Sequence, residues 1–394
     1  MKSLLILGAA DGAMATYRTA RALGYRTVAV DLRDTAPAVA LADELLPVST
    51  RDVSALTAIL RGRSDVAGIL APSSDIALPT QLTLTERFGL PCGLTGATVE
   101  ASVDKRRFRA VCDELGLPGY RWIDGPDWRA AGLRFPLVVK PADAQSSRGV
   151  TRCPDESTVD AAIADALEHS YGAGIVIEEE VLGQHCGCEC VIDDGRVVFM
   201  ALTERHLTPP PQATTTAHVL PAAVAGSVHD ELVAAVDALC ARLGYRRGPL
   251  NLDLVVDTGG RPRLIEMGAR TGGDPLGELA RHCYGINPIE ASISVAVGAP
   301  LPPMPPPAEP RPVMVQLLNA ADTGILTAVH GVEEARAWPE VVRIVLLAEP
   351  GRPVTATIDL TSKLGYALLA ADTPAQLRET ADRLLSTVRF EVRP

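Results

Sequence analysis

The stretch PLNLDLVVDTGGRPRLIEMG, residues 249–268, consists of two apolar runs joined by a turn that contains Gly259 and Gly260. Two glycines at the midpoint predict a β-hairpin, in which Asp253 and Glu266 become cross-strand partners on one face. Opposed carboxylates about 5 Å apart repel each other, so the pair favours a bound cation, and oxygen ligands alone suit Mg²⁺. An exposed pair of strand acids is the alternative that this hairpin alone leaves open.

Lysine is rare in this chain, which makes the position of each lysine informative. Only Lys2, Lys105, Lys140 and Lys363 occur, while arginine supplies the remaining positive charge. Lys105 lies in the first turn of an expected helix, VDKRRFRAVCDELGLP, and Lys140 ends an expected strand, FPLVVKP. Either lysine alone is typical of a solvated surface, but both beside a carboxylate pair indicate an anion-binding site.

The loop DAQSSRG, residues 143–149, follows the strand that ends in Lys140. Ser146, Ser147 and Gly149 have small side chains, so the backbone amides of this loop can approach phosphate oxygens. We therefore predict that the loop covers phosphate groups; an ordinary surface turn is the alternative.

The first hundred residues alternate short apolar strands with helices, which predicts a Rossmann-like open parallel sheet. The turn after the first strand, GAADGA, does not match the G-x-G-x-x-G pattern of dinucleotide sites, and no P-loop pattern occurs in the chain. A second hairpin is expected in CECVIDDGRVVFMAL, with its turn at Asp194 and Gly195.

Composition argues against several classes of function. The chain has 394 residues and a formal net charge of -11, so broad binding of nucleic acid or of anionic membranes is not expected. No apolar run approaches the roughly 18 to 20 residues of a membrane span, and Asp11 interrupts the apolar start. The eight cysteines are too few for a disulfide scaffold, which favours a reducing cytoplasm. Cys186, Cys188 and Cys190 are expected to be small buried residues rather than metal ligands.

The order of these segments resembles the ATP-grasp superfamily over nearly the whole chain: DK..F, PLVVKP with a small-residue loop, IEEEVLG, NLDLVVD and IEMGAR. The resemblance implies an ATP-grasp fold of the α/β and α+β classes. Residues 1–100 would form a Rossmann-like domain and residues 101–300 the ATP-grasp domain, with a small nucleotide-covering subdomain at about 115–185. Residues 301–394 would form a proline-rich linker and a small C-terminal α+β domain.

The resemblance also assigns residues to the nucleotide. Lys105 and Lys140 take the positions that contact the ATP phosphates and the adenine side. Glu178 or Glu179 would accept the exocyclic amine of adenine, and Val181 would supply backbone contacts.

The ribose carboxylate of the superfamily usually follows the hinge acid by seven residues. In this sequence His185 occupies that position, and the nearest glutamate is Glu189. We assign Glu189 to the ribose, which requires an insertion of the four residues HCGC before it.

The superfamily's metal motif is a carboxylate on one strand and E-x-N-x-R on the next. Asp253, Glu266 and Arg270 match it, but Gly268 replaces the asparagine. The metal shell therefore lacks one side-chain oxygen, which Asp274 or water would have to replace. The resemblance implies that Arg270 binds the transferred phosphate and the acyl phosphate formed from it.

The resemblance implies an ATP-dependent carboxylate–amine ligase that forms an amide or peptide bond on amino-acid-like substrates through an acyl phosphate. ATP and Mg²⁺ are the expected cofactors, with Mn²⁺ as an alternative metal. His206 and His218 bracket a proline-rich loop and are predicted to border the substrate, together with Gly272, Gly273 and Asp274 in the turn after the metal strand.

Two alternatives remain at this point. One is a carboxylase similar to biotin carboxylase or aminoimidazole ribonucleotide carboxylase, which would use bicarbonate as the acid. The other is a nucleotide-binding module without catalysis, which the retained metal acids and Arg270 disfavour. The expected partners are a small carboxylate and a small amine, with no nucleic acid and no membrane, and a homodimer is compatible with the resemblance.

Overall fold

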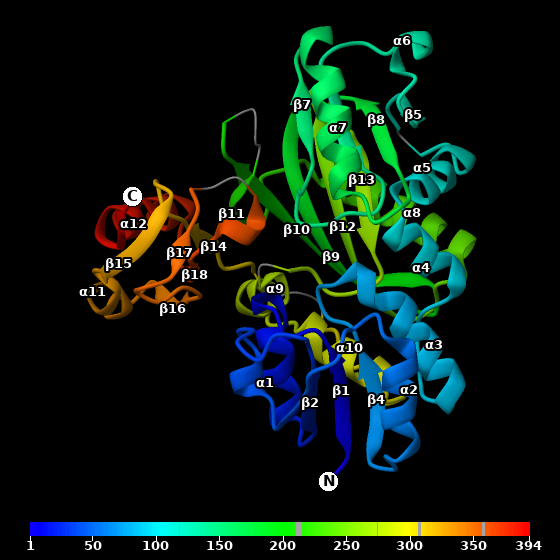
Figure 1. Cartoon of the computed structure of the whole chain (residues 1–394), viewed down its shortest axis with the longest axis vertical. Helices are drawn as coiled ribbons and strands as arrows, with labels where there is room; N and C mark the ends of the chain where they lie inside the picture. Colours follow the sequence, from blue (N-terminus) through cyan, green and yellow to red (C-terminus); the bar gives the residue numbers. More distant parts are fainter. Residues whose placement is uncertain (118, 210–213, 274, 306–308, 357–358) are drawn as a thin grey trace.

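Four β-sheets organise the part of the chain that the computed structural model describes (Figure 1), namely residues 1–117, 119–209, 214–273, 275–305, 309–356 and 359–394. The N-terminal sheet and the largest sheet lie one above the other in Figure 1, and the C-terminal strands lie to one side.

The N-terminal domain is a four-stranded parallel sheet in the order β3-β2-β1-β4, which agrees with the predicted Rossmann-like domain. Its elements are β1 (Ser3–Leu7), η1 (Asp11–Ala13), α1 (Met14–Ala22), β2 (Arg26–Val30), η2 (Val39–Leu41), β3 (Glu44–Leu46), α2 (Val53–Arg61), β4 (Val66–Leu70), η3 (Asp75–Ala77) and α3 (Leu78–Phe88).

Alternation along β1 gives this sheet two buried faces. Leu4 and Ile6 pack with α1 and with α10 (Pro288–Ala296), a helix that comes almost 300 residues later in the chain. Leu5 and Leu7 pack on the opposite side with α2 and α3. The N-terminal domain is therefore held to the rest of the molecule by a helix that follows the predicted metal hairpin.

A small antiparallel sheet, in the order β5-β8-β6-β7, lies in the region for which the sequence predicts a nucleotide-covering subdomain. Its elements are β5 (Trp122–Asp124), α6 (Trp128–Ala131), β6 (Leu137–Pro141), β7 (Thr151–Cys153), η4 (Glu156–Thr158), α7 (Val159–His169) and β8 (Ile175–Glu179). Lys140 lies on β6 and Glu178 on β8, and these two strands pair.

The largest sheet has eight strands in the order β13-β12-β9-β10-β11-β14-β18-β16. Its first five strands are β9 (Gly183–Asp193), β10 (Arg196–Leu207), β11 (Thr215–Leu220), β12 (Gly248–Asp257) and β13 (Pro262–Gly268), and the helices around them are α4 (Gly96–Val103), α5 (Lys105–Glu114), α8 (Gly226–Leu243) and α9 (Leu276–Tyr284). Both predicted hairpins are present, since β9 pairs with β10 and β12 with β13. Cys186, Cys188 and Cys190 are buried in the core under α8, and all eight cysteines are free thiols.

The C-terminal region shares the large sheet and does not form a separate body. Its elements are β14 (Val313–Leu318), β15 (Gly324–His330), α11 (Val332–Arg336), β16 (Val341–Leu346), β17 (Pro353–Val354), η5 (Leu360–Ser362), β18 (Gly365–Ala370), α12 (Pro374–Thr387) and β19 (Arg389–Arg393). Strand β14 pairs with β11, and β17, β15 and β19 form a separate three-stranded sheet. The C-terminal region shares one cluster of buried side chains with β9, β10 and α9, and it has two further clusters that are largely its own.

Ion pairs also connect the C-terminal region to the rest of the chain. Lys363 Nζ lies 2.7 Å from Asp11 Oδ2, and Arg343 Nη1 lies 2.6 Å from Glu278 Oε1. Lys363 thus has a defined structural partner in the N-terminal domain. No helix in the described part of the chain is long and apolar enough to span a membrane.

Candidate functional site

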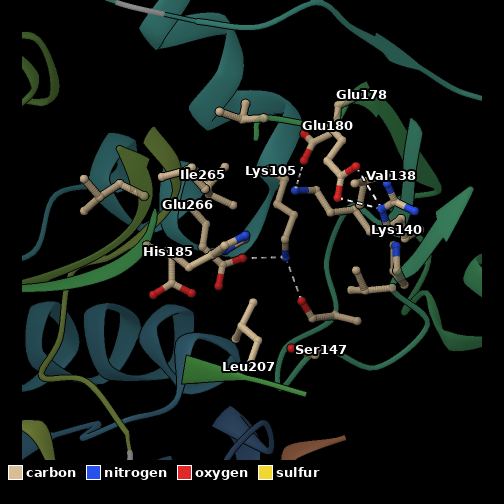
Figure 2. A pocket seen from close by; sticks show the side chains of 18 of the residues that line it. Lys105, Val138, Lys140, Ser147, Glu178, Glu180, His185, Leu207, Ile265 and Glu266 are labelled. Atoms are coloured by element: carbon tan, nitrogen blue, oxygen red, sulfur yellow. Dashed lines mark hydrogen bonds and ion pairs between the residues drawn. The ribbon is translucent and has the colours of Figure 1, made fainter. Parts of the chain in front are cut away.

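A cavity lies between the small sheet and one face of the large sheet (Figure 2). Its volume is about 180 Å³. Residues from four segments line it: Lys105 at the start of α5, Lys140 with the loop 144–148, the segment Glu178–Val181, and the strand residues His185, Arg205, Asp253 and Glu266. The cavity therefore brings together most residues that the sequence assigned to nucleotide and metal.

Lys140 and Glu178 form a buried ion pair at the wall of this cavity. The second oxygen of Glu178 accepts a hydrogen bond from Arg109 Nη2 at 3.1 Å, and Arg109 also donates to the carbonyl of Leu264. Burial lowers the pKa of Lys140, and the neighbouring Glu178 opposes that shift. Lys140 and Arg109 together carry one more charge than Glu178 neutralises, and this net positive charge favours the binding of a polyphosphate.

Lys105 connects the hairpin of β12 and β13 to the loop 143–149. Its ammonium lies 3.2 Å from Glu266 Oε2 and donates to the carbonyl of Ala144 at 2.8 Å. The surrounding protein would raise the pKa of Glu266, but Lys105, Lys140 and Arg270 outweigh it and hold that pKa below its usual range. Glu266 is therefore a carboxylate at neutral pH, as a metal ligand must be.

Asp253 and Glu266 are direct cross-strand partners, as predicted from the two glycines of the turn. Asp253 also forms an ion pair with Arg205 of β10, which donates a second hydrogen bond to Thr215 Oγ1 at 2.8 Å. Among the described residues no group of three or more His, Cys, Asp and Glu side chains is arranged to hold a metal ion. Two carboxylates still fit Mg²⁺, which usually combines one or two protein acids with substrate phosphates and water.

The segment 143–149 has an unusual backbone for a short loop. Ser146, Ser147 and Gly149 all have positive φ, at 63°, 59° and 66°. Ser146 and Ser147 line the cavity, whereas Gly149 lies outside it, where an added Cβ would come within 2.9 Å of His169. Consecutive residues in this conformation turn their amides toward one side, which is the arrangement of a backbone anion site.

We expect residues 143–149 to gain protection from hydrogen exchange when a non-hydrolysable ATP analogue and Mg²⁺ bind. The small residues of this segment let its amides approach phosphate oxygens, so closure over a bound nucleotide would shield these amides from solvent. Exchange measured by mass spectrometry with and without the analogue tests the expectation. Equal exchange in both states would reduce the segment to an ordinary surface turn, and the helix α12, which lies away from β7 and β8 in Figure 1, is the internal control.

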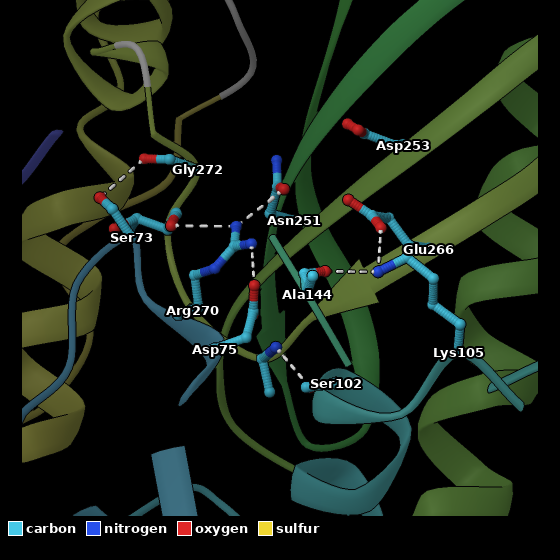
Figure 3. A network of polar contacts seen from close by, with 12 residues as sticks. Ser73, Asp75, Ser102, Lys105, Ala144, Asn251, Asp253, Glu266, Arg270 and Gly272 are labelled. Carbon is cyan, nitrogen blue, oxygen red and sulfur yellow. Dashed lines mark hydrogen bonds and ion pairs between the residues drawn. The ribbon is translucent and has the colours of Figure 1, made fainter. Parts of the chain in front are cut away.

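Arg270 lies outside this cavity, in a second polar network beside it (Figure 3). Its Nη2 lies 2.6 Å from Asp75 Oδ2, and its Nη1 donates to Asn251 Oδ1 at 2.8 Å. Asn251 and Gly268 are cross-strand partners two pairs further along the hairpin than Asp253 and Glu266. Arg270, two residues after the end of β13, therefore lies close to the end of the hairpin that carries these two acids.

The assignment of Glu189 to the ribose does not agree with this structure. The carboxylate of Glu189 is buried and accepts hydrogen bonds from Asn251 Nδ2 at 2.7 Å and from the amide of Gly272 at 2.8 Å. His185 and Glu189 share one face of β9, but four residues of strand separate them by about 13 Å. His185 lines the cavity, whereas Glu189 belongs to the network around Arg270.

The residues predicted to border the substrate are only partly brought together. His218 is buried, with its Nδ1 3.4 Å from Thr203 Oγ1, and it pairs across the strands with Arg205. His206 is half-buried, with its Nε2 3.0 Å from Glu204 Oε1, and it does not line the cavity. Gly272 accepts a hydrogen bond from Ser73 through its carbonyl, and Gly273 lies against Gly12. Asp274 lies outside the described residues.

Four functional candidates in these networks were not found by sequence reasoning: Asp75, Arg109, Arg205 and Asn251. Arg205 lies on the hairpin that turns at Asp194 and Gly195, but the pairing of β12 with β9 is what brings that hairpin to Asp253, and the sequence did not predict this pairing. Asn251 is two residues before Asp253 and therefore on the same strand face. Asp75 comes from another domain, and no local pattern identifies it.

Two family models match the chain. A model of the ATP-grasp domain matches residues 133–277, and a model of the L-amino acid ligase C-terminal domain 2 matches residues 316–393. Residues 133–277 therefore belong to the ATP-grasp domain family. The predicted ATP-grasp fold is confirmed, and the proteins that the chain resembles include ligases, among them an L-amino acid ligase and a D-alanine--D-alanine ligase.

Individual proteins resemble this chain over most of its length. The uncharacterized protein y4rH of Sinorhizobium fredii is 26% identical over 370 residues, which cover 90% of this chain and 75% of that protein. The crystal structure of L-amino acid ligase from Bacillus licheniformis has a TM-score of 0.84 at 20% identity and covers 100% of this chain and 99% of that chain.

A carboxylase has a similar fold. The biotin carboxylase domain of the 2-oxoglutarate carboxylase from Hydrogenobacter thermophilus, solved with MgADP, ADP and bicarbonate, has a TM-score of 0.79 at 16% identity. The match covers 99% of this chain and 91% of that chain. At such identities these likenesses show the shared fold, and the substrates have to be argued from the site.

Proposed function

We propose that the protein forms an amide or peptide bond between a carboxylate and an amine, both amino-acid-like, with an acyl phosphate as intermediate and ADP and phosphate as products. Two features support the amino-acid class. One is the match of residues 316–393 to a domain model of L-amino acid ligases. The other is that this matched region shares the catalytic sheet through β14 and β18 and so belongs to the same core.

The chain's own residues would perform four tasks in this reaction. Lys105 and Lys140 neutralise the triphosphate, and the amides of the loop 143–149 bind its oxygens. Asp253 and Glu266 would hold Mg²⁺ or Mn²⁺ against the phosphates. The bound metal would supply charge neutralisation on the γ-phosphate. Arg270 would then stabilise the phosphoryl group as the substrate carboxylate attacks it.

Bond changes in this scheme balance without a covalent enzyme intermediate. A carboxylate oxygen bonds to the γ-phosphorus while the bond from that phosphorus to the β,γ-bridging oxygen breaks, releasing ADP. The amine nitrogen then attacks the acyl carbon, phosphate leaves, and the amine loses a proton. Closure over the cavity matters because water would otherwise hydrolyse the acyl phosphate first.

The observation that carries the proposal is the cross-strand pair Asp253 and Glu266 in the same cavity as Lys105 and Lys140. A screen of acid and amine pairs for ADP and phosphate release tests it. The proposal predicts release that depends on both an acid and an amine. Release that requires bicarbonate instead would favour the carboxylase alternative, and no release with any pair would favour nucleotide binding alone.

The proposed partners are therefore small molecules. The formal net charge of -11 does not favour a nucleic-acid partner. A homodimer and a reducing cytoplasmic location remain predictions, and the first of them can be measured by analytical ultracentrifugation.

A further inference from the structure

The missing asparagine of the metal motif leaves a space that another residue fills. Gly268 stands at the motif's asparagine position, and its φ is not positive, so its backbone does not require glycine. A Cβ built at Gly268 would come within 2.5 Å of Asp75 Oδ1 and 2.7 Å of Arg270 Cζ. Real Cβ atoms do not approach other atoms so closely. A side chain at residue 268 would therefore displace the Asp75 and Arg270 side chains, which occupy this space.

Asp75 comes from the other side of a domain boundary. It begins η3 in the N-terminal domain, five residues after the end of β4, and is separated from Arg270 by 195 positions in the sequence. Its side chain is only 15% exposed, and its Oδ1 has no hydrogen-bond partner within the described part of the chain. A buried carboxylate retained with one unpaired oxygen is costly, which argues for a role beyond packing.

The guanidinium of Arg270 is held at two of its three nitrogens. Asp75 binds Nη2 from the N-terminal domain, and Asn251 binds Nη1 from the hairpin. The third nitrogen, Nε, is buried and has no acceptor among the described residues. A planar guanidinium fixed at two nitrogens has one orientation, which leaves Nε as a donor for an anionic oxygen.

We propose that Asp75 is the positioning residue of Arg270, and that Gly268 is glycine in order to admit it. The inference rests on the proposed function, because it assigns Arg270 to the transferred phosphoryl group. Asp75 does not touch the phosphoryl group; it orients the arginine that does. The N-terminal domain thereby takes part in phosphoryl transfer through one side chain.

A double-mutant cycle with Gly268→Ala and Asp75→Ala tests this inference. Gly268→Ala changes no charge but adds a methyl group at the position of the Asp75–Arg270 pair. In the parent chain it is expected to lower kcat for ADP formation at least about tenfold while the Kd for ATP changes less than about twofold. In the Asp75→Ala background the added methyl group should cost less than about threefold, because the guanidinium can move into the space left by the carboxylate.

Two controls accompany the cycle. Gly226→Ala is the matched glycine control, since a Cβ there would meet nothing within 4 Å and Gly226 begins α8, away from both networks. Asp75→Asn keeps the shape and one oxygen acceptor, so it should retain more kcat than Asp75→Ala. Thermal unfolding of every variant shows whether it is folded at the assay temperature.

Additive effects of Gly268→Ala and Asp75→Ala on kcat in an active enzyme would overturn the inference and leave the proposed function standing. A loss of ATP affinity as large as the loss of kcat would also overturn it, since Asp75 would then support the whole fold. If Asp75→Ala does not fold, Asp75→Asn takes its place in the same cycle. A parent enzyme that forms no ADP with any acid and amine would instead refute the proposed function.

Discussion

Replacement of Glu266 by alanine is expected to reduce ADP formation by about a thousandfold or more, with no loss of the folded state. Glu266 contributes one of the two carboxylates of the hairpin, and a single remaining acid would hold a divalent cation poorly. The side chain is 39% exposed toward the cavity, so its removal costs little packing. Asp253→Asn is expected to behave in the same way.

Steady-state ADP release over a series of Mg²⁺ concentrations measures this effect, and circular dichroism monitors the fold. Glu231→Ala is a matched control, because Glu231 is an acid paired with Arg261 in the turn of the same hairpin but remote from the cavity. Near-normal ADP release by Glu266→Ala at limiting Mg²⁺ would show that the hairpin acids do not bind the metal.

Replacement of Lys140 by alanine is expected to weaken ATP binding roughly tenfold to a hundredfold, as the loss of a charged hydrogen-bonding partner does. Lys140 lines the cavity and is only 5% exposed. Arg270→Ala is expected to change the Kd for ATP little and to lower kcat on the order of a hundredfold or more, because Arg270 lies outside the cavity and acts on the transferred group.

Isothermal titration with a non-hydrolysable analogue separates the two residues, together with kcat measured at saturating ATP. Lys140→Ala also leaves Glu178 with Arg109 as its one remaining cation among the described residues, so a loss of stability is expected as well. The double variant Lys140→Met with Glu178→Gln removes both charges of the pair and distinguishes lost ATP binding from an unpaired buried charge. Equal losses of ATP affinity in Lys140→Ala and Arg270→Ala would contradict this division of roles.

The sequence predicted the parts of the site that depend on local periodicity. Two glycines located the hairpin turn, and counting from them gives the pair of Asp253 and Glu266. The strands reach this pair through a register shift that the sequence did not predict, because Leu254 pairs with Leu264 nearer the turn. Lys105 and Lys140 could be placed because each lies at the end of a strongly patterned element. Strand alternation put Glu189 on the same face of β9 as His185. Glu189 nevertheless lies outside the cavity, because a residue on that face can be too far along the strand to reach it.

Other features depend on how distant segments meet, and the sequence did not reveal them. The pair of Asp75 and Arg270 joins two domains, and a single aspartate after a strand does not by itself indicate a functional residue. Arg109 is helical and would have been read as a solvated side chain, yet it is buried against Glu178. The intervening prolines indicate a connector but not which strands pair on either side of it. The pairing of β14 with β11 could therefore not be predicted from the sequence.

The shared sheet has a consequence for how this protein folds and is divided. Strand β11 is covered on one side by β10 and on the other by β14, so the C-terminal region protects what would otherwise be an open edge. An unpaired edge with free amide and carbonyl groups is a template for association between molecules. The chain up to the prolines is therefore not a self-sufficient catalytic module. The strands that follow the prolines complete the backbone hydrogen bonding of the sheet on which the chemistry takes place.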